Sequence, residues 1–356
     1  MMVRIRTNTH QTNKGCLCIG QGLTRRIGLC FTVQSCAPQN DPILHLPFLS
    51  SFLFTTVTER IQEHNSQKPA PTFTLGHNAY SDLTLDEFSR HFNLGAYSND
   101  ASLLKSAAQA KLLNADADAA TETRRVLTEQ APLLLPDFVD WVAMGAVTPI
   151  KNQGSCGACW AFSTTGALEG AKFLKTGELT SLSEQNLLDC DKVDLGCNGG
   201  LMDNAFKFGE TSGGLCSEAD YPYQASQGTC NTDCTDVPGS IVSTFIDVPP
   251  GDEKALVSAV AMQPISIAIE ASQFVFQFYK TGVLTDDSCG SRGTIDHGVL
   301  AVGYGTDLDT QATYFKVKNS WGDSWGEDGF IKIGRKSKNE FGICSILKMA
   351  SFPVVE

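Results

Sequence analysis

The segment Gln-Gly-Ser-Cys-Gly-Ala-Cys-Trp-Ala-Phe, at residues 153–162, constrains the fold of this chain more than any other part. From its second cysteine, Cys159, small and apolar side chains recur at helical spacing as far as Gly177, a typical helix stop. They belong to Trp160, Thr164, Ala167, Leu168, Ala171 and Leu174. The pattern predicts a buried helix with Cys159 in its first turn, where the helix dipole favours a thiolate by about 0.3–1 kcal/mol. Because that effect is too small to ionise a thiol alone, a nucleophilic Cys159 needs a base.

One histidine is placed to be that base. Five of the six histidines precede residue 100, and only His297, in Ile-Asp-His-Gly-Val, lies in the region from residue 135 onward that carries Cys159. An imidazole can accept the proton of a thiol and hold it as a cation near neutral pH. We therefore expect His297 to act with Cys159; a core histidine without a chemical role is the alternative.

The stretch Cys156-Gly-Ala-Cys159-Trp matches the pattern C-G-[SA]-C-[WY] around the nucleophile of papain and the cathepsins. His297 follows Cys159 at the spacing of that family, and the chain therefore resembles a papain-like cysteine protease of the cathepsin L type. The resemblance implies that Asn319, in Lys-Asn-Ser-Trp-Gly, orients His297 and that Trp321 shields their hydrogen bond from water. It also implies an oxyanion hole made of the Gln153 side chain and the Cys159 backbone N–H.

The resemblance implies an α+β fold with two lobes and the active site in the cleft between them. A helical lobe would carry Cys159, and a β-rich, barrel-like lobe would carry His297 and Asn319. The sequence itself predicts helices over 159–175, 183–190 and about 203–210. It predicts strands in the second half, over 266–270, 314–318 and 330–333.

The resemblance also maps a set of substrate-binding positions onto this chain: Gly199, Gly200, Leu201, Met202, Ala268, Ile295, Trp321 and Met349. All five positions that would form the P2 pocket are apolar, namely Leu201, Met202, Ala268, Ile295 and Met349. Met349 stands where some relatives carry an acidic residue. A buried P2 arginine without a carboxylate partner would lose its hydration uncompensated, so we expect leucine, valine or phenylalanine at P2. Proline at P2, and a purely structural role for these residues, remain alternatives.

The cysteines fit a disulfide framework. Apart from Cys159, the region from residue 135 onward holds eight cysteines, whose spacing alone allows 105 connectivities. The resemblance implies three pairs, Cys156–Cys197, Cys190–Cys230 and Cys289–Cys344, and we expect Cys216 and Cys234 to form a fourth. A zinc site is the weaker alternative, because the cysteines are scattered and there is no second histidine nearby. We expect no metal or cofactor, and an oxidising compartment: lysosome, vacuole or cell exterior.

The chain divides by composition and motif into an atypical leader (1–50), a partial inhibitory propeptide (51–94), a linker (95–134) and the peptidase (135–356). Residues 76–82 resemble the G-x-N-x-F-x-D motif of cathepsin L-type propeptides, with Tyr80 for phenylalanine. Phe54, Ile61 and Asn65 match the second half of the propeptide helix pattern, whose first half is missing. Residues 1–50 lack the apolar core of a signal peptide. We interpret them as an incorrectly assigned exon; a divergent but genuine leader is the alternative.

The predicted function is that of a cysteine endopeptidase with a Cys-His-Asn mechanism and a thioester intermediate, made as a zymogen. Its partners would be polypeptide substrates, its own propeptide and cystatin-type inhibitors, and we expect a monomer. The net charge of −12 argues against nucleic acid, and no apolar run is long enough to span a membrane. Acid would activate it, with Asp82 as a trigger if that carboxylate is buried. A catalytically dead homologue that only binds, and a transpeptidase, are the competing functions.

Overall fold

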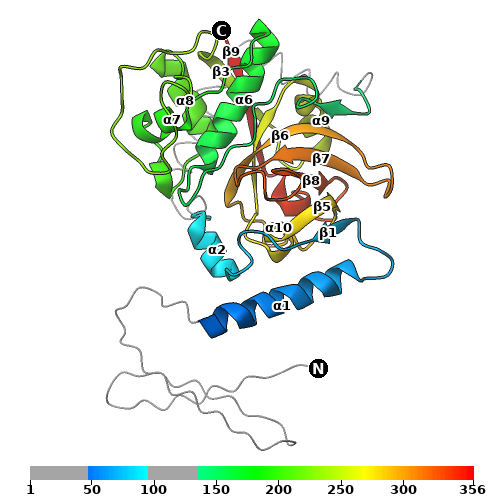
Figure 1. The fold of residues 1–356 in the computed structure, drawn as a ribbon. Coiled ribbons are helices and arrows are strands. Elements are labelled where there is room, and N and C mark those ends of the chain that lie inside the picture. Colours follow the sequence, from blue (N-terminus) through cyan, green and yellow to red (C-terminus); the bar gives the residue numbers. More distant parts are fainter. Residues whose placement is uncertain (1–46, 95–134) are drawn as a thin grey trace, which may run out of the picture. The chain divides into compact units, whose positions relative to one another are not determined.

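The computed structural model describes residues 47–94 and 135–356, with side chains described from residue 53 onward (Figure 1). The predictions for the leader and the linker therefore fall outside the described residues, except that residues 47–50 open a helix. Within the described ranges, no helix is long and apolar enough to cross a membrane.

The architecture is α+β, as predicted, with helices grouped beside a large sheet (Figure 1). The helical lobe contains α6 (Cys159–Thr176), α7 (Glu184–Cys190), the 3-10 helix Gly196–Asn198 and α8 (Met202–Ser212). The three α-helices agree with the predicted ranges to within two residues at each end, and the 3-10 helix was not predicted. Ser183 caps α7, because its hydroxyl accepts a hydrogen bond from the backbone N–H of Asn186.

A nine-stranded sheet forms within the described ranges, in the order β1-β5-β8-β7-β6-β4-β9-β3, with β2 paired to β6. Its strands are β1 (Phe73–Leu75), β2 (Val139–Asp140), β3 (Val242–Val248), β4 (Ile265–Ile269), β5 (Tyr279–Leu284), β6 (His297–Thr306), β7 (Thr313–Lys318), β8 (Phe330–Gly334) and β9 (Met349–Val355). β6 is buried at every residue but its last, which suits a strand at the centre of the sheet. Its first residue, His297, lies directly opposite Ile269 of β4.

The second half is less uniform than predicted, because it also contains α9 (Glu253–Met262) and α10 (Phe274–Gln277). Asp252 caps α9 by accepting a hydrogen bond from the backbone N–H of Ala255. The residues that follow this cap are almost continuously apolar, so helical and extended structure could not be distinguished by periodicity.

Helix α6 is buried on all sides rather than along one stripe. It contacts strands β4, β6 and β9 as well as α7 and α8, and its residues are buried from Cys159 to Lys172. The prediction for Leu174 was wrong: this side chain is 43% exposed, because it lies in the last turn of the helix, beyond the buried stretch that ends at Lys172. The helix ends as predicted at Gly177, whose φ of 75° is left-handed.

The N-terminal layer consists of α1 (Pro47–Asn65), β1 and α2 (Leu85–His91), and from residue 53 onward it packs against the rest of the chain. Strand β1 pairs antiparallel with β5. Asn65 joins α1 to β1, since its amide donates to the carbonyl of Leu75 and accepts from the Leu75 N–H, both at 2.9 Å. Asn78 joins the next turn to α10 by donating to the carbonyl of Gln277 at 2.7 Å.

Four disulfides form in the described part of the chain: Cys156–Cys197, Cys190–Cys230, Cys216–Cys234 and Cys289–Cys344. They are the three pairs that the family resemblance implied and the expected fourth. Three of them lie in the helical lobe and its following loops, where they join segments that no sheet holds together.

A cluster of buried charges joins the segment before α6 to helices α6 and α7. The ammonium of Lys151 lies 3.1 Å from a carboxylate oxygen of Glu169 and 2.6 Å from one of Glu184. Burial alone would lower the pKa of Lys151, but the two carboxylates outweigh it and raise the pKa above its ordinary value. Both glutamates are 1% exposed or less, so their charges depend on these partners.

Candidate active site

Cys159 begins α6 and is 3% exposed, and it is the free cysteine of residues 47–94 and 135–356. Strand β6 passes close to it: a Cβ added to Gly298 would lie 3.2 Å from the Cys159 carbonyl oxygen. His297, the neighbour of Gly298, is thereby brought to the start of α6. The structure thus places the predicted nucleophile and base at the junction of the helical lobe and the sheet.

Asn319 holds His297 in one tautomer. The His297 Nε2 atom lies 2.8 Å from Asn319 Oδ1, and the backbone N–H of Ser320 donates to the same oxygen at 2.8 Å. An oxygen that already accepts a hydrogen bond is an acceptor for the ring as well, so Nε2 carries the proton. Nδ1 is left as the basic nitrogen, and it has no hydrogen-bond partner among the described residues, Cys159 included.

Trp321 covers this pair. Its ring stacks on His297 with centroids 4.7 Å apart and an angle of 23° between the planes, and it is 1% exposed. Aromatic cover of this kind keeps water away from the His297–Asn319 hydrogen bond, which strengthens it. The arrangement matches the role that the resemblance implied for Trp321.

Gln153 is completely buried and tied to both lobes. Its side-chain amide donates to the carbonyl of Cys156 at 3.0 Å, and its side-chain oxygen accepts from the hydroxyl of Ser320 at 2.6 Å. One N–H of the amide remains for a further acceptor. Ser320 was missed at the level of sequence, although it lies directly after Asn319; nothing in its spacing points to Gln153.

The N-terminal layer reaches this site directly. Phe92 stacks on Trp321 with centroids 4.5 Å apart, and Phe88 meets the same ring edge-on at 5.1 Å. The Tyr80 hydroxyl donates to the Trp321 carbonyl at 3.3 Å, and the Asn93 amide donates to the Cys197 carbonyl at 2.8 Å. The residues that flank Cys159 and His297 are therefore covered by the segment that was predicted to inhibit them.

Burial determines the ionisation of the covered pair. Desolvation raises the pKa of the Cys159 thiol to about 11 and lowers the pKa of His297 to about 4, although the bond to Asn319 favours the charged ring. Both groups are therefore neutral near pH 7. The helix dipole, which was expected to be too small to ionise a thiol alone, does not offset the loss of water around the sulfur.

The predicted pocket residues converge on one end of β4. Ala268 lies opposite both Gly298 of β6 and Met349 of β9, and a Cβ on Gly298 would lie 3.2 Å from the sulfur of Met202. Leu201, Met202 and Ala268 are almost fully buried, whereas Ile295 and Met349 are partly exposed. Gly199 and Gly200 form the buried turn between the 3-10 helix and α8.

A contact of Asp194 was not anticipated. Its buried carboxylate accepts from the Leu201 N–H at 2.9 Å and from the Asn204 amide at 3.0 Å, so it fixes the chain just after the Gly199–Gly200 turn. The sequence shows an aspartate in a loop, where a solvated side chain is the ordinary interpretation. Only the folded loop shows that this aspartate points inward.

Asp82 was expected to trigger acid activation if its carboxylate is buried. This condition is not met, because Asp82 is exposed. The sign of the His297 shift supplies another source of acid sensitivity. Any form in which water reaches His297 binds a proton as the pH falls from about 6.5 to about 4, and the covered form does not. The contribution of neutral His297 to the stability of the covered form is therefore complete above pH 6.5 and is lost toward pH 4.

We expect amide hydrogen exchange in α2, measured on full-length Cys159→Ala protein, to accelerate over this pH window beyond its intrinsic pH dependence. The inactive variant prevents cleavage during the measurement. Adding His297→Gln removes the group that binds this proton, so the excess acceleration of hydrogen exchange at low pH should disappear. An identical pH response in both proteins would assign the effect to other groups.

Comparison with known proteins agrees with this geometry. Residues 135–354 match the family model described as papain family cysteine protease. The chain is 44% identical over 303 residues to the senescence-specific cysteine protease SAG12 of Arabidopsis thaliana, covering 85% of this chain and 83% of that protein. It is 43% identical over 310 residues to cathepsin L1 of Drosophila melanogaster, covering 85% and 78%.

Solved proforms share the fold, including the N-terminal layer. The proform of Amb a 11, a cysteine protease and ragweed pollen allergen, superposes with a TM-score of 0.72 at 34% identity, over 86% of this chain and 89% of that one. Digestive procathepsin L 3 from the larval midgut of Tenebrio molitor superposes with a TM-score of 0.70 at 35% identity, over 86% and 91%.

Proposed function

Since the chain belongs to the papain family of cysteine proteases and is a cathepsin L-type zymogen, we propose that it cleaves peptide bonds through a thioester on Cys159. His297 is the proton carrier, Asn319 orients it, and Gln153 helps to bind the oxyanion. The observation that carries this proposal is the His297–Asn319 hydrogen bond beneath Trp321, which leaves Nδ1 as the basic nitrogen at the start of α6. Peptide cleavage by acid-activated protein, beside the Cys159→Ala variant, tests it.

In the proposed reaction, the Cys159 proton moves to His297 Nδ1 once the cleft is open, and the thiolate attacks the peptide carbonyl carbon. A C–S bond forms while the carbonyl electrons move to oxygen, which the Cys159 N–H and the remaining N–H of the Gln153 amide stabilise. The C–N bond then breaks, and Nδ1 gives its proton to the leaving amine. Water next loses a proton to Nδ1 and adds to the thioester, and cleavage of the C–S bond restores the thiolate.

We propose an apolar preference at P2, supported by the convergence of Met202, Ala268 and Met349 at one end of β4. A peptide library should show leucine or phenylalanine at P2 cleaved at least about tenfold faster than arginine, because an unpaired buried guanidinium loses its hydration. Met349→Glu should raise the cleavage rate of peptides with arginine at P2 about tenfold. Met349→Gln, which matches it in size without the charge, should not. Equal cleavage of arginine and leucine peptides by the wild type would exclude this pocket.

The chain has its own propeptide and acts on polypeptides, as its proform relatives indicate. We propose that residues 51–94 are the inhibitory domain, that cleavage within 95–134 releases the peptidase of residues 135–356, and that the product is a monomer open to cystatin-type inhibitors. The contacts of Phe88 and Phe92 with Trp321 support the first of these assignments. The disulfides support an oxidising compartment, namely a lysosome, a vacuole or the cell exterior.

A further inference from the structure

We propose that Tyr223 is a positioning residue for the oxyanion hole, acting through the main chain of Gln153. The inference rests on the proposed function, since it assumes that Gln153 binds the oxyanion. The Tyr223 hydroxyl donates to the Gln153 carbonyl oxygen at 2.8 Å. The two residues are 70 positions apart, and the hydroxyl contacts neither Cys159 nor His297 by a hydrogen bond in the described structure.

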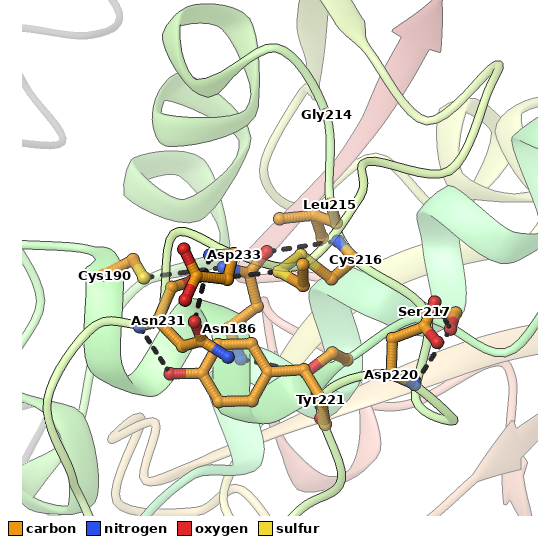
Figure 2. Close-up of a disulfide and its surroundings, with 12 residues drawn as sticks. Asn186, Cys190, Gly214, Leu215, Cys216, Ser217, Asp220, Tyr221, Asn231 and Asp233 are labelled. Atoms are coloured by element: carbon orange, nitrogen blue, oxygen red, sulfur yellow. Dashed lines mark hydrogen bonds between the residues drawn. A yellow bond between two sulfur atoms is a disulfide. The ribbon is translucent and has the colours of Figure 1, made fainter.

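The loop that carries Tyr223 is held at several points. The Cys216–Cys234 disulfide joins its two ends (Figure 2). The Cys190–Cys230 disulfide ties it to the end of α7. Inside the loop, the Tyr221 hydroxyl donates to Asp189 at 2.8 Å and accepts from the Asn231 N–H at 3.0 Å. A loop so fixed can place a hydroxyl reproducibly, which a free surface loop of this length would not do.

Tyr223 itself has little freedom. Its ring meets Phe162 of α6 edge-on with centroids 4.8 Å apart, and its backbone N–H donates to Glu218 at 2.9 Å. Burial and the nearby acidic groups raise the pKa of Tyr223 above its ordinary value, so the hydroxyl remains a donor across the working pH range. The ring therefore delivers a permanent donor to one side of Gln153.

The bond matters because of the residue that follows. Gly154 has a φ of +58°, a conformation that glycine adopts without strain and from which it can also depart easily. The Gln153 carbonyl belongs to the Gln153–Gly154 peptide, and Tyr223 is its partner. Ser320 and Cys156 hold the side chain of Gln153 but not this peptide. The N–H of this peptide donates to the Asn152 side-chain oxygen at 2.9 Å, so Tyr223 and Asn152 hold its two sides. Without the hydroxyl, the carbonyl side loses its partner, which loosens the main chain that carries the amide facing the oxyanion.

The test is Tyr223→Phe in the acid-activated enzyme, which removes the hydroxyl and keeps the ring. We expect kcat to fall about tenfold, with KM changed less than twofold. The affinity for a peptide aldehyde should also fall about tenfold, because the adduct of the aldehyde with Cys159 places an oxyanion in the hole. Alkylation of Cys159 by iodoacetamide forms no oxyanion and should keep its rate. Tyr221→Phe, which removes a hydroxyl from the same loop, is the control for general loosening and should leave kcat within twofold.

A double-mutant cycle with Gln153→Ala separates the possible results. If Tyr223 acts through Gln153, adding Tyr223→Phe to Gln153→Ala changes kcat less than twofold. A wild-type kcat in Tyr223→Phe alone, or a parallel loss of alkylation rate, would overturn the inference. A wild-type kcat in Gln153→Ala would instead refute the proposed oxyanion role of Gln153, and an inactive wild type would refute the proposed function.

Discussion

Replacing Cys159 with alanine will reduce peptide cleavage by at least about 10⁴-fold without unfolding the protein. Cys159 is the free thiol of the described chain, and the proposed mechanism has no second nucleophile. Removal of one buried sulfur at a helix start leaves the disulfides and both lobes intact. The measurement is hydrolysis of a fluorogenic peptide with leucine or phenylalanine at P2, near pH 5.5 and with a reductant, beside thermal unfolding of both proteins.

Ser163 provides the matched control for this variant. It lies one turn further along α6, it is equally buried, and its hydroxyl donates to the carbonyl of Val299 at 2.7 Å. Ser163→Ala also deletes one buried polar atom from the helix, and we expect it to retain activity within about threefold. Cleavage that survives in Cys159→Ala would exclude the thioester mechanism. Absence of cleavage in folded, processed wild type would favour the catalytically dead homologue instead.

The largest effect on stability should come from Lys151→Met. This change leaves Glu169 and Glu184 buried without their shared cation, and removal of one partner from a buried ion pair costs about 3–5 kcal/mol. The measurement is denaturant unfolding at pH 7 in the Cys159→Ala background, which prevents self-digestion. Adding Glu169→Gln and Glu184→Gln should recover part of the loss, because the uncompensated charges are then gone.

Lys316 serves as the control, since it forms a comparable pair with Asp140 at 2.8 Å near the surface. The two side chains are 23% and 17% exposed, so Lys316→Met should cost about 1 kcal/mol or less. If Lys151→Met and Lys316→Met destabilised the protein equally, the buried cluster would have no special structural role.

The sequence predicted best those features that depend on neighbouring residues. Helix α6 follows from its apolar spacing and from Gly177, and β4, β7 and β8 follow from short β-rich runs between turn residues. Helix α9 was missed because its apolar run has no clear period. The exposed end of α6 was missed because periodicity shows which side chains share a helix face, but not how far along the helix that face is buried.

The sequence also identified some residues of the candidate site and not others. Cys159 and His297 could be found because one lies in a distinctive motif and the other has no competing histidine. The partners of Gln153 could not, since Ser320 is 167 residues away and Tyr223 is 70. The raised pKa of the covered Cys159 thiol could not be predicted, because it comes from burial in the folded proform, which no sequence pattern shows.

The pairing of β1 with β5 has a consequence for the mature enzyme. β1 lies at the end of the strand order, so removal of the propeptide would turn β5 into an edge strand with unpaired backbone groups. Such an edge invites other chains to add to it. β5 carries two safeguards at one place, because Lys280 is exposed and the register of the pairing with β1 shifts at this residue. Maturation would therefore uncover a surface that is already protected against aggregation.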